Sequence, residues 1–170
     1  MIYISEYESP LGKMTLAEEN GFLIGLWFND QKYFGSNLTD KVEHKETTTI
    51  LESKHWLDIY FNGEEPKFTP KLAYGSSPFQ KIVLDILLTI PYGHTKAYGE
   101  IAKEAAHKLN KGKMSAQAVG NAISHNPISI IIPCHRVLSG DGSLAGYAGG
   151  IDRKEKMLEL ENIPFKKREY

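Results

Sequence analysis

Residues 126–137, Asn-Pro-Ile-Ser-Ile-Ile-Ile-Pro-Cys-His-Arg-Val, are the most informative segment of this 170-residue chain. The β-branched run predicts a strand that ends at Pro133, because the residue before a proline favours extended geometry and proline itself has no N–H to donate to a strand ladder. Cys134 then lies at a turn beside His135 and Arg136. Neighbouring positive charge stabilises a thiolate and lowers its pKa, so the pattern favours a nucleophilic cysteine. A strand-end cysteine that only fills space is the structural alternative, and these residues alone leave it open.

Cys134 is the only cysteine of the chain, which excludes an internal disulfide and a thiolate-rich zinc site. A cysteine hydrolase needs a contact between the thiol and an imidazole. Successive residues of an extended chain point to opposite sides, so His135 reaches the sulfur only through a water or a sharp turn after Pro133. The hydrolase hypothesis is therefore weaker than a transfer to the thiol.

The sequence before this segment predicts three helices. The first has Ser77 as N-cap and Pro78 at its first position, and it stops before Pro91. Two shorter helices, 98–107 and 115–124, are joined by a lysine-rich link, which indicates helix-turn-helix geometry. The small side chains of residues 116–122 fit either close approach to DNA or ordinary tight packing.

The first half of the chain predicts a small sheet with one helix. Strands are expected at 2–7, 14–17 and 22–28, with Asn-Gly at 20–21 as a hairpin turn. Apolar residues recur at helical spacing from 48 to 62, and residues 63–75 form a connection. At the other end, residues 152–155, Asp-Arg-Lys-Glu, match a capping box that opens a helix through Glu161.

Charge is distributed unevenly. Residues 1–75 carry 7 Lys/Arg and 12 Asp/Glu, a net charge of −5, whereas residues 76–170 carry 13 and 9, a net charge of +4. A polyanionic partner is therefore expected at the second half. With 41% hydrophobic and 24% charged residues, and with neither a secretory signal nor a membrane span, the composition predicts a globular cytoplasmic protein.

The motifs resemble those of the methylated-DNA–protein-cysteine methyltransferases, or O6-alkylguanine-DNA alkyltransferases, in particular the bacterial branch. The resemblance covers nearly the whole chain. Its most specific part is residues 132–137, supported by Asn126-Pro127 and by the Gly-Tyr-Ala-Gly-Gly of residues 146–150. A weaker match is residues 7–16.

This resemblance implies an α+β fold in two domains. Residues 1–75 are expected to form a small α/β domain like ribonuclease H, and residues 76–170 a mainly helical, winged-helix-like domain that binds DNA. The implied function is repair of double-stranded DNA by a monomer. The alkyl group of O6-alkylguanine, with O4-alkylthymine as a further candidate, moves irreversibly to Cys134 after base flipping. No cofactor, metal or membrane is implied.

The resemblance also implies roles for individual residues. Cys134 is the acceptor, His135 takes the thiol proton through a water, and Glu161 orients His135. Asn126 fixes the turn, and Tyr98 gives a proton to the departing base. Positions expected to contact DNA or the base are Ser115, Gln117, Asn121, Arg136, Tyr147, Ala148, Gly149 and Lys154; for Arg136 structural hydrogen bonds are also expected.

Two departures from the family pattern concern base recognition. Gln117 replaces an intercalating arginine, so Lys108, Lys111 and Lys113 of the link are expected to supply phosphate contacts. Ala148 replaces a serine found in some relatives, which leaves backbone amides to hold O6. A rival function is a non-enzymatic damage sensor similar to the alkyltransferase-like proteins, but these lack the acceptor cysteine.

Overall fold

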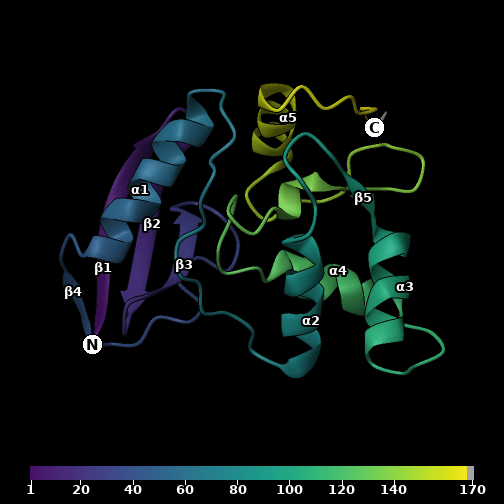
Figure 1. Ribbon diagram of the computed structural model, residues 1–170, viewed down its shortest axis with the longest axis horizontal. Helices are drawn as coiled ribbons and strands as arrows, with labels where there is room; N and C mark the ends of the chain where they lie inside the picture. Colours follow the sequence, from purple (N-terminus) through teal and green to yellow (C-terminus); the bar gives the residue numbers. More distant parts are fainter. Residues whose placement is uncertain (168–170) are drawn as a thin grey trace. The chain divides into compact units, whose positions relative to one another are not determined.

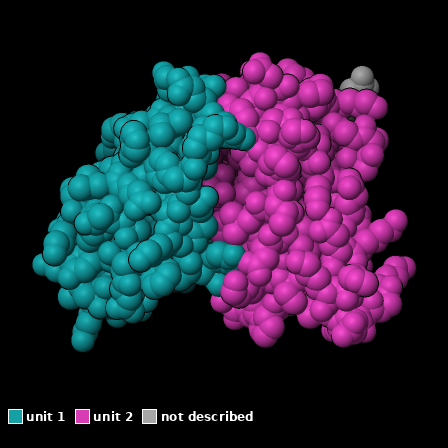
Figure 2. Space-filling view, viewed as in Figure 1, with its two compact units in different colours: residues 1–74, 127–129 teal, residues 75–126, 130–170 magenta. Residues whose placement is uncertain are grey.

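The computed structural model describes residues 1–167, which form two compact units (Figures 1 and 2). Unit 1 comprises residues 1–74 together with 127–129, and unit 2 comprises residues 75–126 and 130–167. A sheet with a helix in unit 1 and a mainly helical unit 2 confirm the α+β fold class. Within residues 1–167 no helix combines the length and the apolar character that crossing a bilayer requires.

Unit 1 is a four-stranded sheet with one helix on its face (Figure 1). The strands pair in the order β3-β2-β1-β4, with β4 parallel to β1 and the other pairs antiparallel. Asn20 and Gly21 have φ of 54° and 85°, so both occupy the left-handed region that a tight hairpin turn needs, and the predicted hairpin is confirmed. The elements are β1 (Ile2–Ser9), β2 (Gly12–Glu19), β3 (Phe22–Phe28), β4 (Val42–His44) and α1 (Thr48–Phe61).

Unit 2 is built on the three predicted helices, which pack against one another (Figure 1). As expected, Ser77 caps the first helix by accepting from Gln80 N, and Pro78 is its first residue. Two short strands pair in parallel beside them. The elements are α2 (Pro78–Leu87), β5 (Lys96–Ala97), α3 (Tyr98–Lys108), α4 (Ala116–Ser124), the 3-10 helix η1 (Cys134–Arg136), β6 (Val137–Leu138) and α5 (Ile151–Leu160).

The strand expected before Pro133 is absent, and this prediction was wrong. Only Ile128 pairs, in an isolated parallel bridge to Leu26. Ile130 then takes a φ of 71°, which turns the chain out of extended geometry. The apolar run is continuous because it is buried on all sides, and burial alone does not distinguish a strand from a buried turn.

The capping box expected at residues 152–155 is also absent. Helix α5 begins two residues earlier than that capping box implies, at Ile151, and its N-cap is Gly150 with φ of 97° and no side-chain cap. Asp152 therefore lies inside the first turn, where a carboxylate still interacts favourably with the helix dipole.

Candidate active site

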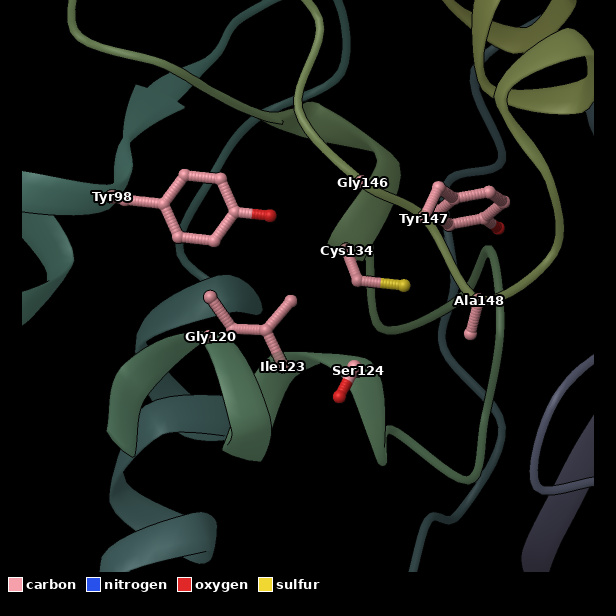
Figure 3. A pocket seen from close by; sticks show the side chains of 8 residues that line it. All are labelled: Tyr98, Gly120, Ile123, Ser124, Cys134, Gly146, Tyr147 and Ala148. Carbon is pink, nitrogen blue, oxygen red and sulfur yellow. The ribbon is translucent and has the colours of Figure 1, made fainter. Parts of the chain in front are cut away.

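Cys134 opens the 3-10 helix η1 and lines a pocket that lies entirely within unit 2 (Figure 3). One side of the pocket comes from α4, which contributes Gly120, Ile123 and Ser124, and the other from the loop at residues 146–148. Tyr98, the first residue of α3, extends its ring into the pocket with the hydroxyl directed towards the sulfur side. The thiol is thus enclosed, with 6% of the residue exposed, but it faces a cavity.

The side chain of Asn126 holds the sulfur. Its Nδ2 donates to the carbonyl of Ile132 at 2.9 Å and to Sγ of Cys134 at 3.2 Å. Asn126 is itself 5% exposed, so the amide has no competing bulk water. A donor aimed at sulfur stabilises the thiolate more than the thiol.

The pKa of the thiol differs from the expectation of a lowered value. Burial raises the pKa of Cys134, and the Asn126 amide and the Lys154 ammonium oppose this only in part. The neighbouring Arg136 does not lower the pKa as the sequence suggested, because its guanidinium is bonded to Glu161. The resting sulfur is therefore protonated at neutral pH, and attack requires a base.

A buried carboxylate organises the residues around His135. Glu161 Oε2 lies 2.6 Å from His135 Nε2. The other oxygen, Oε1, accepts from Arg136 Nε at 2.8 Å and from the backbone N–H of Gly93 at 3.0 Å. Because Nε2 is hydrogen-bonded to the carboxylate, Nδ1 is the ring nitrogen that can accept a proton from the thiol.

Burial also determines the protonation of His135. Its side chain is fully buried, and burial lowers the pKa although Glu161 acts in the opposite direction. The imidazole is therefore neutral at neutral pH and able to accept a proton. The pKa of His135 is lower in the folded state than in the unfolded state, so the neutral imidazole stabilises the fold at pH values above the ordinary pKa of histidine. This contribution to folding stability declines as the pH falls below that ordinary pKa.

Two cations that were expected near DNA or the base are buried. The ammonium of Lys154 is fully buried and donates to the carbonyls of Val137 at 2.6 Å and Ala145 at 3.4 Å, so it cannot reach a phosphate from this position. Arg136 is 7% exposed and donates to Ile90 O at 2.9 Å as well as to Glu161. Nothing in the sequence around Arg136 or Lys154 indicates that either side chain is buried.

The exposed side of α4 carries the remaining predicted DNA contacts. Gln117 and Asn121 lie one turn apart and are both exposed. Ser115 caps the helix by accepting from Ala118 N at 3.0 Å. The link before α4 exposes Lys108, Lys111 and Lys113.

The loop opposite α4 contains Tyr147, Ala148 and Gly149. Tyr147 and Ala148 line the pocket, and Tyr147 O accepts from Gly150 N at 2.9 Å in a tight turn. Ile123 and Ser124 also line the pocket, although neither was expected there from the sequence. Their i+3 and i+4 spacing from Gly120 is a signal that could have found them, since it places all three on one helix face.

A single buried thiol that faces a pocket, with a carboxylate–imidazole pair next to it, defines a protein with a nucleophilic cysteine. Two family models match the chain: "6-O-methylguanine DNA methyltransferase, ribonuclease-like domain" over residues 2–74, and "6-O-methylguanine DNA methyltransferase, DNA binding domain" over residues 78–163. The chain belongs to the 6-O-methylguanine DNA methyltransferase family.

Its relatives carry consistent names. The methylated-DNA–protein-cysteine methyltransferase of Mycobacterium leprae is 42% identical over 95% of this chain and 93% of its own length. The constitutive enzyme of that name from Bacillus subtilis is 34% identical over 99% of this chain and all of its own. The crystal structure of Mycobacterium tuberculosis OGT in complex with DNA is similar to 94% of this chain and 92% of that chain, with a TM-score of 0.82 and 39% identity.

Proposed function

We propose that this protein repairs double-stranded DNA by transferring the alkyl group of O6-alkylguanine to Cys134, once per molecule and as a monomer. The observation that carries the proposal is the enclosed sulfur of Cys134, held by Asn126 and open to a pocket lined by Tyr98. The family relationship supports the substrate, because the relatives are named for transfer from methylated DNA to a protein cysteine.

Proton removal begins the reaction. The raised pKa of Cys134 keeps the proton on sulfur, and the neutral His135 accepts it through a water at Nδ1. The imidazolium that forms is stabilised by Glu161, whose carboxylate lies 2.6 Å away. The Asn126 amide stabilises the thiolate at the same time.

Transfer is a displacement at carbon. The thiolate forms the S–C bond while the C–O6 bond breaks, and guanine leaves with the electron pair. Tyr98 then supplies a proton to the departing base, which would otherwise leave as an anion. A thioether has no route back to thiol, so each molecule reacts once.

The exposed part of α4 is the surface proposed to meet DNA. The base must leave the duplex to reach a buried sulfur, and flipping costs a few kcal/mol. Gln117 and Asn121, both exposed, fill the space left in the stack. The exposed Lys108, Lys111 and Lys113 contact phosphates.

The function is tested by intact-mass measurement after mixing with duplex DNA that contains one O6-methylguanine. The expected mass increase is one methylene equivalent, about 14 Da, on the peptide that contains Cys134. Demethylated guanine should form in equal amount to protein. Continued product formation with excess DNA would instead indicate a hydrolase, and binding without a mass increase would indicate a damage sensor.

Gln117 provides a second prediction, which concerns flipping. Gln117→Ala should slow transfer from duplex DNA by about tenfold or more, because nothing then fills the vacated stack. Transfer from free O6-benzylguanine should stay nearly unchanged, because a free base needs no flipping. Gln117→Arg should bind undamaged duplex more tightly, with a salt dependence steeper by about one phosphate contact. Equal slowing on both substrates would assign Gln117 to the pocket and move the intercalating role to Asn121.

A further inference from the structure

Residues 127–129 fold with unit 1, although the chain on either side belongs to unit 2. Strand β3 holds them by two backbone hydrogen bonds: Leu26 N donates to Pro127 O at 2.8 Å, and Ser129 N donates to Leu26 O at 2.9 Å. The chain that leads to Cys134 is therefore fastened to the sheet of unit 1 five residues before the sulfur.

A buried side-chain contact adds to this attachment. The Oε1 atom of Gln31 accepts from the hydroxyl of Ser129 at 3.2 Å and from the backbone N–H of Phe28 at 2.9 Å. Gln31 is 8% exposed and Ser129 3% exposed. Buried polar groups that lose their partner incur a desolvation penalty, so this pair resists separation.

Ile130, the next residue, is in a conformation that needs external support. It has φ of 71° and is fully buried, and a β-branched residue is rarely found in this left-handed region. Such a conformation persists only where the surroundings impose it. After Ile130 in the chain, Ile132 O and Cys134 Sγ are both held by the Asn126 amide. Before Ile130, the support is the hydrogen bond between Ser129 and Gln31.

We propose that Gln31 is a positioning residue for Cys134: through Ser129 it keeps Ile130 left-handed and so keeps the sulfur at the Asn126 amide. The proposal rests on the proposed function for its physiological meaning. It gives unit 1 a role in the reaction although Gln31 touches neither substrate nor sulfur. Loss of the Ser129–Gln31 contact lets Ile130 relax towards extended geometry and moves the thiol away from the Asn126 amide.

The first test is a double-mutant cycle of Gln31→Ala and Ser129→Ala, read as the single-turnover rate of methyl transfer from O6-methylguanine DNA. Each variant should be slower by about fivefold to tenfold, the effect of one buried hydrogen bond. The double variant should be no slower than the slower single variant, because both remove the same contact. Effects that multiply would overturn the proposal.

Control variants separate positioning from stability. Thr15→Val removes a partly buried side-chain hydrogen bond of the same unit, from Thr15 Oγ1 to Asn29 Oδ1 at 2.7 Å, without involving residues 127–129. It should leave the rate unchanged, and Ser129→Thr, which keeps a hydroxyl, should restore most of the rate lost in Ser129→Ala. If Thr15→Val slowed transfer as much as Ser129→Ala does, the effect would reflect general loss of stability in unit 1, and Gln31 would have no specific positioning role.

A DNA-independent measurement keeps the proposal testable if the proposed function fails. The rate of Cys134 alkylation by iodoacetamide, followed against pH, reports the apparent pKa of the thiol. Ser129→Ala should raise this pKa, because the Asn126 amide no longer meets the sulfur. In an Ile130→Gly background, where the left-handed conformation is unstrained, the same substitution should have a smaller effect. An unchanged pH profile in Ser129→Ala would overturn the positioning role, whereas absence of methyl transfer in the unmodified chain would overturn only the proposed function.

Discussion

A Cys134→Ser variant is expected to gain no mass from O6-methylguanine DNA, while its affinity for that DNA is retained. Serine keeps a hydrogen-bonding atom near the Asn126 amide that contacts Sγ at 3.2 Å in the native site. Its hydroxyl has a far higher pKa than a thiol and is a weak nucleophile without a stronger base. The buried site adds to this difference, because burial already raises the pKa of the native thiol.

The measurement combines intact mass with duplex binding and thermal unfolding of the same preparation. Unchanged unfolding and binding with no adduct would show that only the reacting atom was lost. Because Cys134 is the only cysteine, an adduct on the variant would lie on another nucleophile and would remove Cys134 from the mechanism.

The sequence was most reliable where local chemistry determines the structure. Ser77 and Pro78 begin a helix because a hydroxyl N-cap and a proline at the first position suit the free N–H groups there. Asn20-Gly21 forms the hairpin because both residues tolerate positive φ. These elements depend on neighbours in sequence and hardly on the rest of the fold.

It was least reliable where tertiary contacts dominate. Ile130 is a β-branched residue with positive φ, which no propensity predicts; the contacts on both sides of it impose the conformation. The expected strand therefore became a turn. Helix α5 begins after Gly150, and not at an Asp152 cap, because a left-handed glycine already redirects the chain there.

Part of the candidate site could be predicted from the sequence, but its electrostatics could not. Cys134, His135, Glu161 and Asn126 were all named from the family resemblance, and the structure places them together. Glu161 is 26 residues from His135, a pairing that spacing alone could not give. Burial, which a sequence does not report, reversed the expected shift of the thiol pKa and placed the Lys154 ammonium inside.

The second large effect is expected for Glu161→Ala. The single-turnover rate should fall by at least about 100-fold, the usual scale for losing general-base assistance. The variant should also lose about 3 kcal/mol or more of folding stability, because Arg136 would remain as a buried charge without its carboxylate. The exposed Glu159→Ala in the same helix serves as the matched control and should change neither quantity.

Glu161→Gln separates the two effects. The amide oxygen of glutamine can still accept from Arg136 Nε and Gly93 N, as Oε1 of the carboxylate does. Arg136 loses its counter-charge in both variants, but in Glu161→Gln it keeps this hydrogen bond, so part of the stability should be retained. Its NH2 group would then face His135 Nε2 in place of Oε2 and force that nitrogen to accept a hydrogen bond. The ring proton must move to Nδ1, which can no longer take a proton from the thiol. We therefore expect Glu161→Gln to be slowed about as severely as Glu161→Ala while unfolding at a clearly higher temperature. A rate close to the native one would show that the carboxylate supports the fold and that His135 is not the base.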